Sequence, residues 1–248
     1  MRSSQSRLLL AAAAFLAWHG AHAAHPLVTE DTGTQGTGGW HLELNAERTR
    51  DTVEGVTERA RQSAATLSYG PLDSVDLQLT VAHLRVRGGE RGALDTALDL
   101  KWRFYEEAAL SFALKPGLTL PTGDEEAGRG SGEATWGALA IASYQLERWA
   151  LHGHAGYRRN RNRLGEREAL WQLAGALWYN ATPALALIVD LSLDRDPDPA
   201  SGSELRQTVL GVIYGVTKDV DLDAGMRWGN DPAIDRALLF GVTLRWPG

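Results

Sequence analysis

The sequence contains no cysteine, so it can form neither a disulfide framework nor a thiolate metal site, and it has no cysteine to carry a lipid. Its formal charge of -6 at pH 7 argues against a nucleic-acid partner, which would call for a basic surface. After residue 23 there is no apolar run of about 18 residues, the length expected of a transmembrane helix. If the chain is integral to a membrane, it must therefore cross as a β-barrel.

The first residues have the three-part layout of a secretory signal peptide. Arg2 and Arg7 precede an apolar run from Leu8 to Trp18, and Ala21 and Ala23 supply small residues before a cleavage point. We therefore expect residues 1–23 to be removed on export. The next stretch, 24–38, is rich in threonine and glycine and is expected to be a periplasmic N-terminal segment. The sequence leaves open whether it lies on the periplasmic side of the barrel or folds up into its lumen.

Alternation of apolar and polar residues with period two runs through the rest of the chain. Leu98, Leu100 and Trp102, for example, alternate with charged residues. The pattern predicts about twelve strands, near residues 39–49, 58–69, 74–87, 93–105, 108–120, 134–146, 149–159, 167–180, 184–194, 205–217, 221–229 and 236–246. Short connections alternate with longer polar ones, as in bacterial outer-membrane barrels. The predicted fold class is all-β: one antiparallel transmembrane barrel over residues 39–248, with short periplasmic turns and longer extracellular loops.

Three features interrupt this pattern. The apolar phase switches at Leu84 in segment 74–87, which predicts a bulge. Pro116 lies within a predicted strand and cannot donate to a ladder, so it marks either a kink or a wrong boundary. A tight turn is predicted at Glu106 and Glu107.

The aromatic residues indicate which face of the strands meets lipid. They share the apolar phase of their strands and stand mostly near strand ends, as in the aromatic girdles of membrane barrels. Only Trp178 breaks the phase. The predicted girdle comprises Trp40, Tyr69, Trp102, Trp136, Tyr144, Trp149, Tyr157, Trp171, Tyr179, Trp228 and Trp246.

The opposite face carries charges of both signs and is predicted to face the lumen. Such charges require water or one another. The predicted pore-lining residues are Glu43, Asp99, Lys101, Arg103, Lys115, His152, His154, Asp190, Asp223, Arg227 and Arg245. The pattern is compatible with a lumen that is open, plugged or filled by side chains.

Three stretches of the sequence resemble a known family: "HPLVTEDTGTQGTGGWHLELNAE" at 25–47, "KPGLTLPTGDEEAGRGSGEATWG" at 115–137 and the closing "LLFGVTLRW". Together they resemble the outer-membrane transporters grouped under the meta-pathway of phenol degradation. The resemblance implies an outer-membrane barrel that passes small molecules, often aromatic or hydrophobic, and it implies no catalytic residues.

The sequence offers little support for a metal site, an enzyme or a calcium loop. His152 and His154 lie two apart and could bind a metal, but hydrogen-bonded lumen histidines are the better interpretation. His83, Ser111, Ser143 and Ser192 are framed by no lipase motif, so an outer-membrane lipid enzyme is disfavoured. We expect no catalytic set, metal or cofactor. The acidic, glycine-rich stretch 124–133 is expected to be a solvated loop.

The expected partners follow from the predicted location. They are outer-membrane lipid and lipopolysaccharide, the barrel assembly machinery and a small-molecule solute. The arginine-rich stretch 158–167 could bind lipopolysaccharide phosphates or could simply be solvated. The leading functional prediction is a passive channel, and the alternative is a non-transporting structural or adhesive surface barrel.

Overall fold

The computed structural model describes residues 25–53, 56–230 and 236–248 of the chain, so the predicted signal peptide lies outside the described residues. The described residues form thirteen strands. These are β1 (Trp40–Val53), β2 (Val56–Leu72), β3 (Val75–Val86), β4 (Arg91–Ala93), β5 (Thr96–Glu107), β6 (Leu110–Leu120), β7 (Thr135–Gln145), β8 (Trp149–Arg159), β9 (Ala169–Thr182), β10 (Leu185–Arg195), β11 (Glu204–Gly215), β12 (Val220–Gly229) and β13 (Arg236–Trp246). No helix long and apolar enough to cross a bilayer occurs in the described part of the chain.

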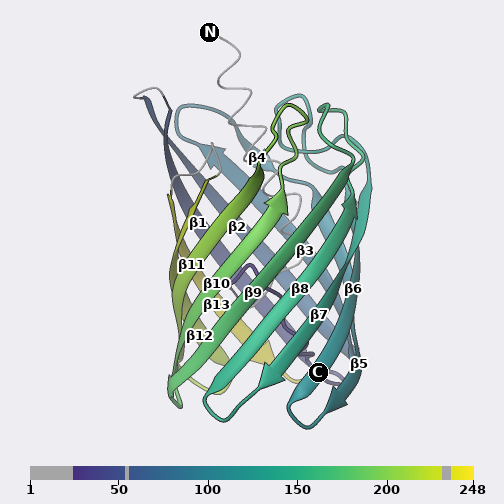
Figure 1. The fold of residues 1–248 in the computed structure, drawn as a ribbon, viewed down its shortest axis with the longest axis vertical. Helices are drawn as coiled ribbons and strands as arrows, with labels where there is room; N and C mark the ends of the chain where they lie inside the picture. The colour runs from purple at the N-terminus through teal and green to yellow at the C-terminus, as the bar shows by residue number, and fades with distance from the viewer. Residues whose placement is uncertain (1–24, 54–55, 231–235) are drawn as a thin grey trace.

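The twelve long strands close into an antiparallel barrel (Figure 1). Each long strand pairs with its neighbours in the sequence, and β1 pairs with β13 from Trp40 opposite Trp246 to Arg50 opposite Arg236. β4 is a three-residue strand that pairs with the end of β3. The predicted fold class is therefore confirmed, and β4 is the one strand that the alternation did not predict.

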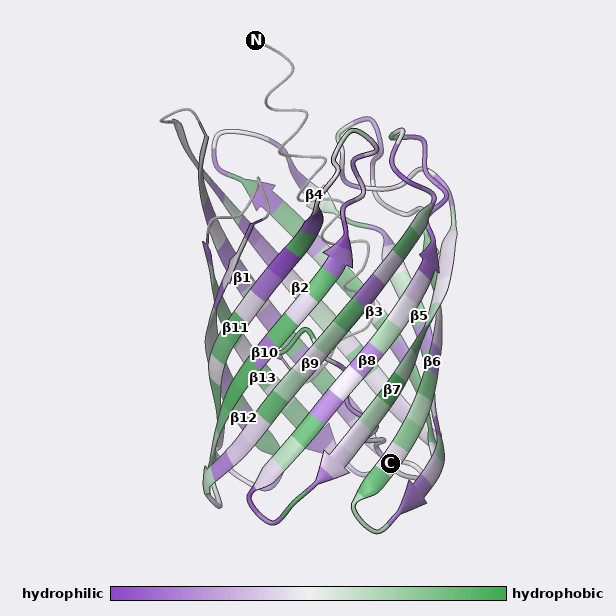
Figure 2. Ribbon diagram, in the orientation of Figure 1, coloured by the Kyte–Doolittle hydropathy of each residue, from purple (hydrophilic) through white to green (hydrophobic). Residues whose placement is uncertain are grey.

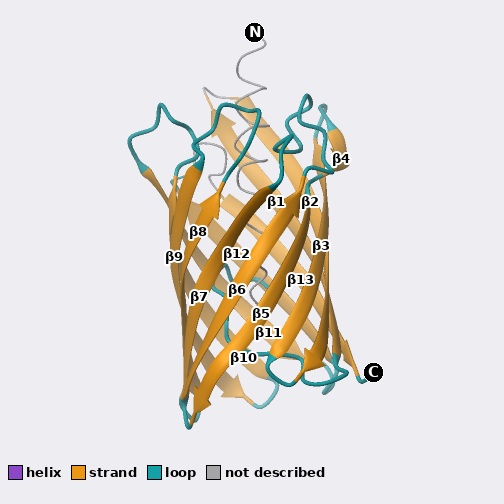
Figure 3. Cartoon of the chain, turned by 90° about the vertical axis from the view of Figure 1, so that its right-hand side faces the viewer, coloured by secondary structure: helices purple, strands orange, loops and turns teal. Residues whose placement is uncertain are grey.

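The connections sort to the two ends of the barrel, as predicted. Tight turns join β5 to β6, β7 to β8 and β9 to β10 at one end, and longer loops lie at the other (Figures 1 and 3). We call these the turn end and the loop end. The first predicted loop, at 50–58, is wrong, because β1 and β2 continue to Val53 and from Val56.

Two local predictions are also wrong. β3 stays in regular register with β2 from Leu77 to Val86, so the predicted bulge does not exist there; the register instead shifts between Tyr69 and Leu72 of β2. Leu84 simply faces inward and is buried. The turn between β5 and β6 falls after Glu107 rather than on it, with Ala108 at φ 51°.

Pro116 lies inside β6, whose bounds match the predicted strand. The ladder between β5 and β6 is interrupted at Leu100 and Lys101, the positions that would otherwise pair with Pro116 and Lys115. On its other side Pro116 is paired with Ala138 of β7. The proline therefore interrupts one ladder without ending the strand, as expected of a residue that has no N–H to donate.

The outward face of the wall is apolar. Large aliphatic side chains on it are exposed in every part of the barrel, among them Leu79, Leu151, Leu191 and Leu210. Along many of the strands hydrophobic and hydrophilic residues alternate (Figure 2). Because so broad an exposed apolar surface is unfavourable in water, this belt is the part of the molecule that requires lipid around it.

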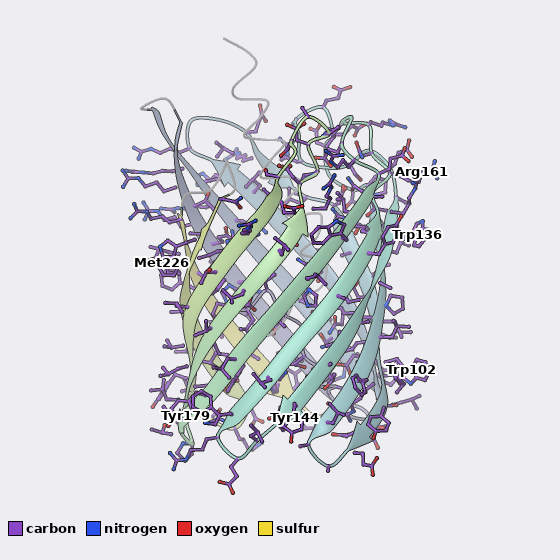
Figure 4. The ribbon with its side chains drawn as sticks, viewed as in Figure 1. Trp102, Trp136, Tyr144, Arg161, Tyr179 and Met226 are labelled. Carbon is purple, nitrogen blue, oxygen red and sulfur yellow. The ribbon has the colours of Figure 1, made fainter. Side chains whose placement is uncertain are left out.

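Aromatic side chains stand on the same outward face near the two edges of the belt. Trp102, Tyr144 and Tyr179 lie toward the turn end, and Trp136 lies toward the loop end (Figure 4). At the closing seam Trp40 contacts both Tyr69 and Trp246, with ring centroids 4.6 and 6.4 Å apart. Of the remaining predicted girdle residues, Trp149 is exposed and its ring contacts that of Tyr179. The other three lie toward the loop end: Tyr157, Trp171 and Trp228.

Candidate functional site: the barrel interior

Residues 25–38, which we call the lumen segment, run through the turn-end half of the barrel interior and continue into β1. The segment is held mainly through its own backbone. The amides of Val28 and Thr29 donate to Asp190 Oδ2 at 3.0 and 2.8 Å, and the amide of Glu30 donates to His154 Nδ1 at 3.0 Å. Of the two placements that the sequence left open, the structure shows the one inside the barrel.

Glu30 is the most tightly bound side chain of the lumen segment. Its carboxylate lies 2.7 Å from Lys115 Nζ and 2.8 Å from Lys101 Nζ, and all three side chains are buried. Asp31 lies further from Lys101, at 3.8 Å, and is partly exposed. Burial, the largest influence, raises the pKa of Glu30, but the charges and hydrogen bonds of the two lysines outweigh it and bring the pKa down to about 2. Glu30 is therefore ionised over the whole physiological range.

The lumen segment continues along the inner wall toward the turn end by further hydrogen bonds. The amide of Thr32 donates to Ser143 Oγ at 3.1 Å, and the amide of Gln35 donates to Asp76 Oδ1 at 3.0 Å. At the rim the amide and hydroxyl of Thr37 both donate to Asp73, in the turn after β2. The hydroxyl and then the amide of Thr37 lower the pKa of Asp73 from its ordinary value.

The first described residues lie in a recess formed by wall glycines. A Cβ at Gly211 would lie 2.6 Å from Pro26 Cγ, a Cβ at Gly225 would lie 3.0 Å from the same ring, and one at Gly241 would lie 2.6 Å from His25 Nδ1. Gly211 and Gly225 are direct partners across β11 and β12. The absence of side chains at these positions makes the space that His25 and Pro26 fill. His25 also bonds to Asp223 beside the recess.

A small apolar contact completes the attachment. Leu27 packs with Ala176, Ile188 and other buried aliphatic residues of β9 to β11, and Trp178 packs against this cluster. Trp178 faces inward for this reason, which explains why it alone broke the aromatic phase. Its Nε1 donates to Asn180 Oδ1 at 2.9 Å.

The predicted pore-lining residues fall into two groups. Lys101, Lys115, His154, Asp190 and Asp223 contact the lumen segment, as described above. The others make contacts within the wall or at its rim: Arg227 with Glu47, Arg245 with Asp221, Arg103 with Glu106, His152 with Ser143, Glu43 beside His41, and Asp99 facing the space above Gly117. The interior thus has charges of both signs, and two of its buried cations, Lys101 and Lys115, are paired with Glu30 of the lumen segment.

At the loop end, the stretch 121–134 is held by hydrogen bonds and ion pairs of buried and partly buried side chains. Asp95 accepts hydrogen bonds from the amides of Gly123 and Ser131 at 2.9 and 2.8 Å. Arg129, which is buried, forms ion pairs with Glu90 and Asp124. The prediction of a solvated loop is therefore wrong for residues 128–131, which are buried, whereas Asp124 and Glu126 of the same stretch are exposed.

The arginine-rich stretch 158–167 is largely paired within the protein. Arg159 pairs with Glu168, Arg161 with Glu133 and Arg163 with Glu125. Arg158 is buried, and Arg167 donates to the carbonyl oxygens of Pro199 and Ser201. Few of its charges are therefore left for a lipopolysaccharide phosphate.

The barrel interior presents no cluster of metal ligands in the part of the chain that the structure describes. No three His, Asp or Glu side chains there are grouped as metal ligands. Ser143 and His152 are 2.9 Å apart, but Ser143 also accepts the amide of Thr32 and so helps to hold the lumen segment.

Residues 23–246 match the family described as "Putative MetA-pathway of phenol degradation". Among solved structures, the chain is similar to the COG4313 outer membrane channel from Pseudomonas putida F1, with 15% identity, a TM-score of 0.62, and coverage of 87% of this chain and 98% of that one. It is also similar to the KdgM porin in complex with disordered oligogalacturonate, with 9% identity, a TM-score of 0.57, and coverage of 82% and 98%. Comparison with curated protein sequences finds no match. At these identities the structural likeness supports the fold.

Proposed function

Because the chain belongs to the family described as "Putative MetA-pathway of phenol degradation", we propose that it is an outer-membrane channel through which small molecules diffuse passively. Aromatic compounds are among the solutes that the family description suggests. The similar structures carry the names of a channel and of a porin with a bound oligogalacturonate, which agrees with this proposal. The protein acts in this proposal by binding and passage, without a catalytic step.

The observation that carries the proposal is the lumen segment itself. An interior that admits a peptide strand and holds it by hydrogen bonds and ion pairs is wide and polar enough to admit a small solute when that strand is displaced. The segment is attached by Asp190, His154 and the two lysines, with only a small apolar cluster at Leu27. Polar contacts of this kind can exchange with water, so displacement of the segment does not require the barrel to unfold.

The proposed orientation places the turn end in the periplasm and the loop end outside the cell. In this orientation the signal peptide has been removed after residue 23, and the barrel assembly machinery inserts the strands. Protease treatment of whole cells tests the orientation. Cleavage within the loop 196–203 on intact cells is expected, and cleavage there only after the outer membrane is broken would contradict it.

One specific observation favours a second candidate, a non-transporting surface barrel: the turn-end half of the lumen is occupied. Planar-bilayer recording separates the two candidates. We expect the wild-type protein to show discrete conductance steps and a variant lacking residues 25–35 to show larger or longer-lived ones. Asp99→Ala should change ion selectivity, because it removes a carboxyl group from the inner wall beside Gly117. If neither the wild type nor the deletion variant shows conductance steps, the surface barrel is favoured.

A further inference from the structure

Two rows of arginines cross the first strands of the barrel near the loop end. In the first row, Arg48 of β1 is the direct partner of Arg61 of β2, Arg61 is the partner of Arg85 of β3, and Arg85 is the partner of Arg91 of β4. One step further from the turn end, a second row comprises Arg236, Arg50, Arg59 and Arg87. In it, Arg50 pairs with both Arg236 and Arg59, and the amide of Arg87 donates to the carbonyl of Arg59 at 2.9 Å. We call these eight residues the arginine patch.

The arginine patch lies on the outside of the barrel. Arg48 and Arg50 alternate in the same phase of β1 as Trp40 and Leu44, and Leu44 is an exposed residue of the apolar belt. Arg61 shares the phase of Tyr69 on β2 in the same way. Nitrogen-tipped side chains project outward beside the loop-end part of β1 and β2 (Figure 4). The patch therefore begins where the apolar belt ends, at the level that lipid head groups occupy.

No acidic side chain that the structure describes forms an ion pair with this patch. Among the side chains that the structure describes, none of the eight arginines takes part in an ion pair. The acidic residue of the turn beside Arg91, Glu90, is paired with Arg129 instead. Adjacent strands lie about 4.8 Å apart, and like charges directly opposite one another on them destabilise a sheet. The chain as a whole carries a net charge of -6, so this concentration of positive charge is local.

The chemistry of the patch identifies what would relieve that repulsion. A guanidinium group binds phosphate through two parallel N–H donors, and a phosphate between two arginines can accept from both. The ligand must also sit beside an apolar belt, which acyl chains would cover. A lipid whose head group carries several phosphates meets both conditions.

We propose that the arginine patch binds the phosphorylated head group of lipopolysaccharide in the outer leaflet, with its phosphates between the two arginine rows. The inference rests on the outer-membrane location proposed above but not on transport. It replaces stretch 158–167 as the lipopolysaccharide contact, because the arginines of that stretch are paired with glutamates or turned inward.

Lipopolysaccharide binding to the purified full-length barrel in detergent tests the proposal. The patch variant is Arg48→Gln/Arg61→Gln/Arg85→Gln, and the matched control is Arg159→Gln/Arg161→Gln/Arg163→Gln, which removes the same number of exposed arginines from paired positions. We expect the patch variant to bind at least about tenfold more weakly, the effect of about 1.4 kcal/mol of lost interaction. The control should bind within about twofold of the wild type, since its removed charges made exposed ion pairs.

A second arm needs no variant. Lipopolysaccharide treated with a phosphatase should bind the wild-type barrel as weakly as intact lipopolysaccharide binds the patch variant. Added salt should weaken the binding of intact lipopolysaccharide and leave the binding of the phosphatase-treated lipid unchanged. Equal binding by the patch variant and the wild type, equal losses in both triple variants, or indifference to phosphate removal would each overturn the proposal. If the barrel binds lipopolysaccharide as expected but shows no conductance, the proposed transport function is wrong and the proposed lipopolysaccharide contact is still supported.

Discussion

Lys115 Nζ donates to Glu30 Oε1 across 2.7 Å inside the barrel, and neither side chain is exposed to solvent. Lys115 belongs to the wall and Glu30 to the lumen segment, so this bond joins a fixed part of the molecule to a part attached by non-covalent contacts. Lys101 lies on the other carboxylate oxygen at 2.8 Å. Two wall lysines, Lys101 and Lys115, therefore form ion pairs with the same carboxylate of the lumen segment.

Glu30→Gln should release the lumen segment. Removing one partner of a buried ion pair costs about 3–5 kcal/mol, because the remaining charge is left without compensation. Here the two lysines can recover hydration if the segment leaves, so the loss should appear as displacement of the segment rather than as unfolding of the barrel. Single-channel recording should show larger or longer openings in Glu30→Gln than in the wild type. Asp31→Asn is the control, since Asp31 is partly exposed and lies 3.8 Å from Lys101. Equal effects of the two substitutions would contradict this role of Glu30.

Acid should loosen the lumen segment in the wild type. The pKa of Glu30 is about 2 in the seated segment and near its ordinary 4.5 when the segment is free. A carboxyl group whose pKa is lowered in the seated state stabilises that state at every pH above the pKa of the free group. The contribution is lost as the pH falls from the free pKa to the lowered pKa. Seating should therefore weaken between about pH 4.5 and 2, by up to about 1.4 kcal/mol per pH unit for this one group. As the pH is lowered across this range, the conductance of the wild type should rise, and that of Glu30→Gln should change less.

The glycine recess offers a test that changes no charge. Gly225→Val would place side-chain carbon where Pro26 lies, because even a Cβ there would be 3.0 Å from the ring. We expect the first residues of the lumen segment to be displaced and a protease added from the turn end to cleave near His25 faster. Gly175→Ala is the matched control, since the nearest atom to its Cβ would be 3.8 Å away. Unchanged cleavage in Gly225→Val would show that the recess does not seat the segment.

The wall of this barrel could be predicted from the sequence because its signal is local. Alternation along single strands indicated all twelve long strands, and aromatic residues in the apolar phase indicated which face meets lipid. Trp178 also carried information, since its wrong phase corresponds to the inward cluster around Leu27. β4 is too short to produce a pattern.

The contacts of the lumen segment could not be predicted, because they join residues far apart in the chain. Glu30 meets Lys101 and Lys115 only after the wall has closed, and no spacing links these three residues. The arginine patch was missed for a related reason. Its members come from β1 to β4, from the turn between β3 and β4, and from β13, and they become rows only when the strand register is known. The sequence instead indicated the dense arginines of 158–167 as a candidate lipopolysaccharide contact, although glutamates pair with several of them.

The outward face can be tested by placing a charge at two depths on one strand. Leu210 lies near the middle of β11 and Tyr214 near its turn end, and both side chains are about half exposed on the apolar face, at 48% and 52%. Leu210→Arg should reduce the folding free energy in lipid vesicles by about 2–4 kcal/mol, whereas Tyr214→Arg should cost about 0–1 kcal/mol through its charge, because an arginine near the interface reaches water. Urea titration of folding into vesicles of a single lipid measures both. The difference between the variants carries the test, since both add the same charge to the same strand. Equal losses would mean that Leu210 does not lie deeper in lipid than Tyr214, and the belt would then have to be placed at a different level on the wall.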